Sequence, residues 1–236
     1  MLTANLIAVV LVALALTRLP SAFRGRNALI AAAAFAIVLA FVLITPGVYG
    51  PLDRLFPIPN LLDLVAKLLL FTGLLLASTQ VARAWNAPTT QRRVSGLPGA
   101  AVFVGLFLVD VVIFAVVHTT TQGVDLTGDF SSPLARLYST VATAYPAYLA
   151  TVLLPHVRQG LTSTQTSTRA TSRFLFVGFS LALLRFAVAL LTLAVPGAYG
   201  IGQVISGLAA IFVALGLATA FFARFGRMRA AARQFN

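Results

Sequence analysis

Four residue types are missing or almost missing from this chain. In 236 residues it has no cysteine and no glutamate, one lysine and one tryptophan. Without cysteine there is no disulfide framework and no thiolate metal site, and the two histidines are too few for a histidine-rich metal centre. Phosphate-binding loops, dinucleotide fingerprints and GxSxG nucleophile motifs are also absent. We therefore expect no enzyme activity, no metal and no cofactor.

Charge is scarce too, and one sign dominates. Charged residues make up 9% of the chain and hydrophobic residues 59%, whereas soluble domains are about 25% charged. A net charge of +12 would suggest a nucleic-acid partner in a soluble protein, but here the arginines lie in short gaps between long apolar runs. The composition predicts an all-α integral membrane protein, a single domain over residues 1–236, with the lipid bilayer as a partner and no nucleic acid.

Seven apolar runs are long enough to cross a bilayer. A hydrocarbon core of about 30 Å takes roughly 20 helical residues. The runs predict seven transmembrane helices, over Leu2–Leu19, Ala28–Thr45, Leu61–Ala82, Leu97–His118, Leu134–Leu154, Phe174–Val195 and Ile201–Phe222. Arginines follow the first run and none precedes it, the reverse of a cleavable signal peptide, so we expect a retained first helix.

The arginines also predict the orientation of the helices. Basic residues accumulate in cytoplasmic loops, and 13 of the 17 fall in alternate gaps on one side of the predicted bundle. The opposite side has Arg54 in its loops, Arg136 at a helix entrance and three of the five aspartates. This alternation predicts an N-terminus outside and a C-terminus in the cytoplasm, in a multi-pass protein of the cell inner (plasma) membrane.

Two similar hexapeptides suggest an internal repeat. TPGVYG at residues 45–50 and VPGAYG at residues 195–200 both fall at outer corners of the predicted topology. Parallel repeats over residues 1–82 and 134–223, with an inverting linker helix over 97–118, would give a 3+1+3 plan of the kind that some transporters use. Turn chemistry alone is the alternative, because Pro-Gly stops helices and tyrosine favours the membrane interface.

Four ionisable side chains fall inside predicted helices, where an unpaired charge is costly. Asp63 and Lys67 are four residues apart on one helix, which is the spacing of a local ion pair. Asp110 and Arg185 are predicted at similar depths, about 12 and 15 Å from the outer helix ends. We expect Asp110 and Arg185 to pair across the interior, either as a structural contact or as a solute-binding charge.

Further polar side chains are predicted to extend this pair into an outward-facing cavity. His118 follows Asp110 at the helical spacing i, i+8, and Tyr145 and Tyr148 lie near the middle of a helix, where a phenol needs a partner. Gln203, and Ser206 after it, continue the polar lining outward. The predicted ligand-binding residues are Asp110, Arg185, Tyr145, Tyr148, Lys67, Asp63, His118 and Gln203.

Three other features are predicted to be structural. Tyr138 is expected to belong to the interfacial aromatic belt. Small residues at four-residue spacing are expected to let a neighbouring helix approach closely; they are Gly202, Ser206, Ala210 and Ala214. The polar stretch Leu161–Arg173 is predicted to be a loop.

Two stretches resemble a known family. RGRNALIAAAAFA at residues 24–36 and ITPGVYGPLDRLFPIPNLLDLVAKLLL at residues 44–70 resemble the membrane half of an actinobacterial seven-helix transporter family. Members commonly continue into a cytoplasmic domain, so the resemblance implies either that this chain has no signalling role or that signalling involves a separate cytoplasmic protein partner. By topology alone the chain is also similar to SWEET sugar transporters and microbial rhodopsins, but Lys67 lies on the third helix, not at the retinal-binding position.

Two functions are consistent with these features. In one, the protein binds or transports a small solute through the outward-facing polar cavity, and the suspected repeat favours this. In the other, it is a ligand-sensing or partner-binding, receptor-like module with basic inner loops as a docking surface. Transport predicts that polar residues continue toward the inner side, where the sequence has few.

Overall fold

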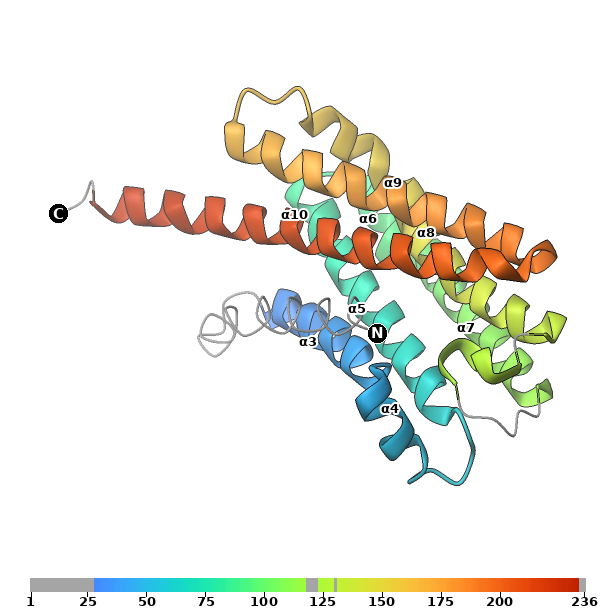
Figure 1. Ribbon diagram of the computed structural model, residues 1–236. Coiled ribbons are helices and arrows are strands. Elements are labelled where there is room, and N and C mark those ends of the chain that lie inside the picture. Colours follow the sequence, from blue (N-terminus) through green and yellow to red (C-terminus); the bar gives the residue numbers. More distant parts are fainter. Residues whose placement is uncertain (1–27, 118–122, 130, 234–236) are drawn as a thin grey trace.

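The computed structural model describes residues 28–117, 123–129 and 131–233, and within these ranges the chain forms helices and no strands (Figure 1). The long helices are α3 (Ala28–Leu43), α5 (Leu61–Ala84), α7 (Leu97–Val116), α8 (Pro133–Gly160), α9 (Thr166–Ala194) and α10 (Tyr199–Arg233). Shorter elements connect them: α4 (Pro46–Asp53), α6 (Pro88–Ser95) and the 3-10 helices η1 (Val124–Asp129) and η2 (Pro196–Ala198).

Within the described residues, five helical segments are long and apolar enough to cross a membrane, or six if α3 and α4, which are bent by 81° relative to each other, count as one broken span. The bundle is therefore compatible with an integral membrane protein. Six of the seven predicted segments are helical, whereas Leu2–Leu19 lies outside the described residues. The count of seven, the orientation and the repeat stay predictions.

The start of α9 corrects one prediction. The polar stretch Leu161–Arg173 was expected to be a loop, but the helix begins at Thr166. Polar side chains at this start bond to one another and to the preceding turn: Thr168 Oγ1 donates to Gln165 Oε1, and Arg169 Nε donates to the carbonyl of Ser163. The apolar run therefore covers only part of this helix, and the helix begins before it.

The two hexapeptides are both helix starts. Pro46 is at the first position of α4 and Pro196 at the first position of η2, which leads into α10. Proline fits there because the first N–H groups of a helix have no intrahelical acceptor. This shared chemistry accounts for the Pro-Gly pairs with or without a repeat.

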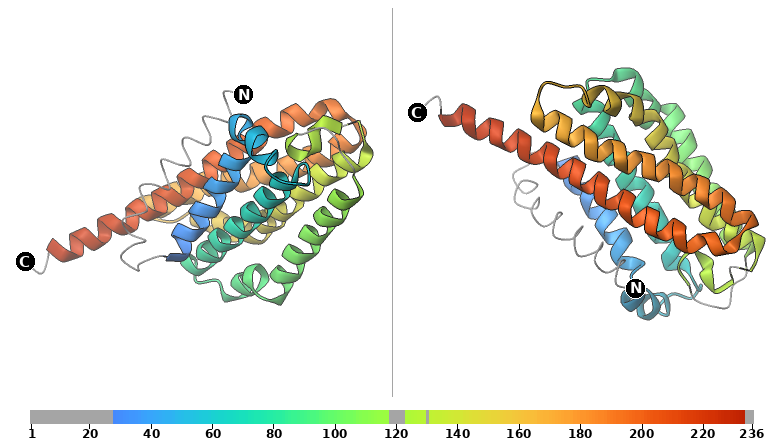
Figure 2. Two further views of the ribbon diagram at one scale, coloured as in Figure 1. Left: turned by 90° about the horizontal axis from the view of Figure 1, so that it is seen from below. Right: turned by 45° about the horizontal axis from the view of Figure 1, so that its top comes forward.

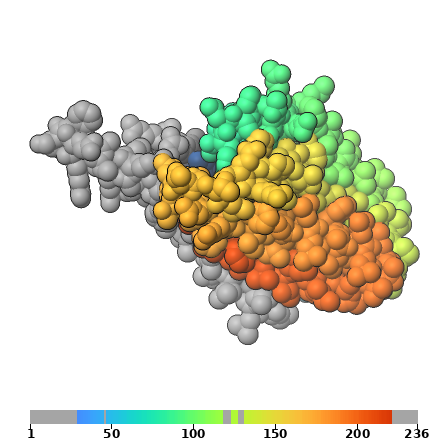
Figure 3. Space-filling view, turned by 90° about the horizontal axis from the view of Figure 1, so that it is seen from above, coloured from blue at the N-terminus to red at the C-terminus, as the bar shows by residue number. Residues whose placement is uncertain are grey.

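The helices form two groups joined through α8. Helix α3 packs beside α5 on one side and α10 packs beside α9 on the other (Figure 2). Helix α8 contacts α5, α7 and α9, and Figure 3 shows α8 and α9 as a yellow-to-orange surface flanked by the green α6 and α7. The main apolar core lies where α5, α8 and α9 meet, around Phe71, Leu153 and Leu175.

Glycines bring helices together at two places. A methyl group added at Gly73 of α5 would lie 2.6 Å from Ile37 of α3, and one added at Gly178 of α9 would lie 2.7 Å from Val213 of α10. The predicted small-residue stripe has a different role: Gly202 contacts the Arg185 guanidinium, and Ser206, Ala210 and Ala214 line a cavity. Gly202 therefore admits a side chain of the neighbouring helix α9, whereas the other three positions of the stripe face the cavity.

Candidate functional site

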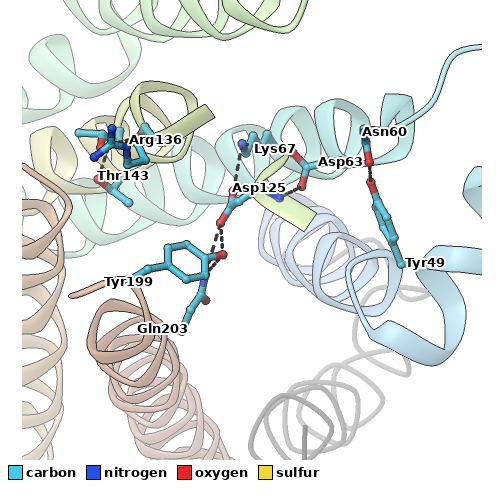
Figure 4. A network of polar contacts seen from close by, with 10 residues as sticks. Tyr49, Asn60, Asp63, Lys67, Asp125, Arg136, Thr143, Tyr199 and Gln203 are labelled. Atoms are coloured by element: carbon cyan, nitrogen blue, oxygen red, sulfur yellow. Dashed lines mark hydrogen bonds and ion pairs between the residues drawn. The ribbon is translucent and has the colours of Figure 1, made fainter. Parts of the chain in front are cut away.

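One end of the bundle gathers most of its buried polar side chains. The start of α5, the connection η1 and the starts of α8 and α10 meet there. Figure 4 shows Lys67 of α5 and Tyr199 and Gln203 of α10 pointing toward Asp125 of η1. We call this set the Lys67 cluster. It consists of Asp63, Lys67, Asp125, Tyr138, Tyr199 and Gln203.

Lys67 is the centre of the cluster. Its Nζ lies 3.2 Å from Asp63 Oδ2 and 3.0 Å from Asp125 Oδ1. The ammonium also lies 3.1 Å from the centre of the Tyr138 ring, an arrangement in which the ring's negative face attracts the cation. Lys67 is 6% exposed and Asp63 1%, so the pair predicted from the i, i+4 spacing is confirmed and is buried. A buried pair of this kind is costly to break, since either charge left alone would be unsolvated.

Asp125 connects the two groups of helices. It lies on η1, and its Oδ2 accepts hydrogen bonds from Tyr199 Oη at 3.1 Å and Gln203 Nε2 at 3.3 Å, both on α10. Its backbone N–H donates to Asp63 Oδ1 at 3.1 Å. Burial alone would raise the pKa of Asp125, but the ammonium of Lys67 and its hydrogen bond hold that pKa below the usual range. The residue therefore bridges α5 and α10 as a carboxylate.

The backbone at Asp125 is strained. Asp125 has φ 56° and Leu126 φ 55°, a left-handed conformation that aspartate tolerates and leucine rarely adopts. The Leu126 side chain is fully buried against Ile113, Ala135 and Tyr138, which holds the segment in place. Strain of this kind costs of order 1–3 kcal/mol per residue and tends to persist at functional sites.

A second group of polar contacts holds the turn between α4 and α5 in place. Asn60, which precedes α5, is fully buried with φ 65°, and its Oδ1 accepts hydrogen bonds from Tyr49 Oη at 2.8 Å and from Gly123 N at 2.9 Å. The Asp53 carboxylate accepts from the N–H groups of Asn60 and Leu62, at 2.8 and 3.2 Å, where the helix dipole favours a negative charge. The tyrosines of both hexapeptides, Tyr49 and Tyr199, thus donate to side chains at this end of the bundle.

Asp110 and Arg185 do not pair, which corrects the central sequence prediction. Arg185 Nε donates to Ser206 Oγ at 3.0 Å, and no described carboxylate lies within ion-pair distance of this guanidinium. Asp110 is fully buried, neither of its carboxylate oxygens has a hydrogen-bond partner among the described residues, and the basic charge that acts on it is that of Lys67. Equal depth was a poor guide because α7 packs on α5, α6 and α8, whereas α9 packs on α8 and α10.

The predicted tyrosines also lie elsewhere. Tyr145 is buried in the apolar core against Phe71 and Phe103, and Tyr148 Oη donates to the Arg93 carbonyl at 2.7 Å, toward the end of the bundle where α6 lies. Neither belongs to the Lys67 cluster, so their place in the predicted cavity is wrong. Tyr138, expected at the interface, is fully buried under Lys67.

The remaining predictions have mixed outcomes. Gln203 joins the cluster through Asp125 and Tyr199, and Ser206 accepts from Arg185. His118 lies outside the described residues. Asp125 and Tyr199 were missed, because a loop aspartate and a corner tyrosine carry no periodic signal. The VPGAYG hexapeptide was the one available pointer to Tyr199.

A cavity of about 760 Å³ opens between the two groups of helices. Its lining comes from α3 and α5 on one side, from α9 and α10 on the other, and from η1 and α8 between them. On α5 the lining runs from Asp63 to Arg83, a rise of about 30 Å at 1.5 Å per residue. The volume is within the range of roughly 300–1,000 Å³ that is usual for ligand sites.

The cavity has polar ends and an apolar middle. Lys67, Asp125, Arg185, Gln203 and Ser206 line the end at the Lys67 cluster. The middle is lined by apolar side chains that include Phe71, Leu74, Phe179, Ala182 and Val213, and the far end by Arg83, Thr168 and Thr171. This arrangement can hold an elongated molecule with one polar end.

No family model, curated protein or solved structure matches the chain. The resemblance to the actinobacterial transporter family therefore stays an expectation.

Proposed function

We propose that this protein is a plasma-membrane protein that binds a small solute in the cavity between α3–α5 and α9–α10, and that it transports that solute. The observation that carries the proposal is the coincidence of a long cavity with a buried ionic cluster at one end. Buried ion pairs in membrane helices are expensive and commonly mark solute or ion pathways. The proposal places the Lys67 cluster at the outer side and the arginine-rich end in the cytoplasm.

Two observations favour transport. The lining of the cavity follows α5 for most of its length, and polar residues at its far end, such as Arg83 and Thr171, continue the path. Across the cluster end, Asp125 joins α5 to α10 through a strained segment, so release of its contacts would separate the two groups of helices. Alternating access requires such a separable contact at each end of a pathway.

A receptor-like function is supported by a different observation. Helix α10 lines the cavity from Gln203 onward and continues to Arg233 as one helix, whose end projects beyond the rest of the bundle (Figure 1). A ligand in the cavity would then act on a helix that reaches a partner on the basic side.

The test is a thermal-shift screen of the purified full-length protein against sugars, amino acids, nucleosides and lipids, because a solute that binds only the folded state raises the melting temperature. Ala210→Phe adds a ring inside the cavity and should remove the shift. Val204→Phe adds the same ring on the same helix, at a side chain that is 58% exposed, and should keep it. A screen without any shift would refute solute binding.

Accumulation of the solute in proteoliposomes distinguishes a transporter from a receptor. A transported solute that binds the wild type accumulates in proteoliposomes that contain the protein, and Ala210→Phe abolishes the accumulation. Binding without accumulation would favour the receptor.

A further inference from the structure

Among the described residues, Arg185 is the one arginine that lines the cavity at the cluster end. Its side chain is 5% exposed, its Nε donates to Ser206, and its Nη1 is buried with no hydrogen-bond partner. Gly202 leaves the space that this group occupies, since a methyl group added there would lie 2.8 Å from Nη1. The sequence of α10 thus makes room for a guanidinium without supplying a carboxylate for it.

The two cations at this end differ in their charge balance. Lys67 has two carboxylates within 3.2 Å. Arg185 has none within ion-pair distance among the described residues, and Asp125, whose charge acts on it from further away, has its oxygens engaged by Lys67, Tyr199 and Gln203. A buried guanidinium in this position gains most from an anion, and its planar fork matches a carboxylate in particular.

The wall beyond Arg185 is mainly apolar. Within a few turns of the guanidinium the lining includes Phe71 on α5, Phe179 on α9 and Val213 on α10, and its polar members on α8 are Ser139 and Thr143. A sugar would leave its hydroxyl groups unpaired against the apolar side chains, which costs about 1–3 kcal/mol for each buried unpaired group. An alkyl chain would gain about 0.8 kcal/mol for each methylene that it buries.

We propose that the ligand of this cavity is a single-chain amphiphile with a carboxylate head, held by Arg185 and Ser206, and with its alkyl chain along Phe71, Phe179 and Val213. This inference rests on the proposed function, because it names the class of solute. The proposed ligand has an anionic head and an unbranched apolar tail.

The test compares three head groups on one chain length. Radiolabelled hexadecanoate binds to the purified full-length protein in a neutral detergent, with hexadecan-1-ol and hexadecyltrimethylammonium as competitors. The wild type should prefer the carboxylate to the alcohol by about 10- to 100-fold, since a hydrogen bond to a charged group contributes that much to binding. The trimethylammonium should compete no better than the alcohol.

Three variants assign the head group to Arg185. Arg185→Gln should abolish the preference for the carboxylate and leave the affinity for the alcohol within roughly twofold. Gly202→Ala displaces the guanidinium and keeps its charge, so it should reduce the preference even if Arg185→Gln does not fold. Arg54→Gln removes an exposed arginine at the end of α4 and should change nothing. A preference that survives both Arg185→Gln and Gly202→Ala would overturn the proposal.

An introduced cysteine tests whether the cavity is accessible to a small molecule. The chain has no cysteine, so Ala210→Cys gives a single thiol in the lining. It should react with a small thiol reagent in the free protein and be protected by hexadecanoate. If the thiol does not react in the ligand-free protein, another part of the chain, for example residues 2–19, fills the cavity. That result would overturn the proposal.

The outcomes separate this inference from the proposed function. Binding of a polar solute, together with no binding of any of the three amphiphiles, would overturn the carboxylate assignment and leave solute binding standing. No binding of any solute or amphiphile would refute both.

Discussion

Replacement of Lys67 by methionine tests the ionic cluster. At an effective dielectric constant of about 20, each of its two attractions, at 3.0 and 3.2 Å, is about 5 kcal/mol. Desolvation of the ions offsets much of this, but in Lys67→Met the carboxylates of Asp63 and Asp125 would stay buried without their cation. Removal of one partner from a buried pair costs about 3–5 kcal/mol. For a chain of this size the melting temperature should fall by about 6–20 °C.

The assay is thermal unfolding of the purified protein in detergent, followed by tryptophan fluorescence or light scattering. Arg54→Met is the matched control, because it removes a positive charge from an exposed side chain and should shift the melting temperature little. In a double-mutant cycle, Lys67→Met with Asp125→Asn should give an interaction energy of about 1–3 kcal/mol. A loss in Lys67→Met no larger than that in Arg54→Met would refute the burial of the cluster.

Three other measurements follow from the contacts. Asp110→Asn should leave the melting temperature unchanged or raise it, because no described side chain pairs with Asp110. Its effect on stability should add to that of Arg185→Gln. Strong coupling between the two substitutions would show that Asp110 and Arg185 do pair. Gly178→Leu should destabilise the protein by about 1–3 kcal/mol, because it overpacks the contact with Val213, and wild-type stability would contradict this contact. Because the pKa of Asp125 is held below its unfolded value, its stabilising contribution should be complete at neutral pH and decline below about pH 4, more in the wild type than in Asp125→Asn.

Much of the fold could be predicted from the sequence because lipid imposes a simple rule. A helix that crosses a bilayer needs about 20 apolar residues, and that pattern located α3, α5 and α7 to α10 within a few residues in most cases. Elements without such a pattern were not predicted, notably α4, α6 and the polar start of α9. These depend on local capping and on contacts with neighbouring helices.

The site was predicted only where its members share a helix. The spacing of Asp63 and Lys67 gave their ion pair, because residues four apart on a helix face the same way. The pairing of Asp110 with Arg185 failed, since depth along a helix does not tell which neighbours the helix has. Asp125 could not be found from the sequence, because its role depends on how η1 folds back between α5 and α10.

The single lysine allows a direct test of the buried cluster. In the folded protein an amine-reactive acetylating reagent should leave Lys67 unmodified, because the residue is 6% exposed and its ammonium is held between two carboxylates. Peptide mass spectrometry after brief labelling measures the modification of Lys67, and labelling in denaturant gives the reference for full access. The account predicts that Lys67 reacts only once the protein unfolds. Modification of Lys67 in the folded protein at the rate measured in denaturant would contradict it.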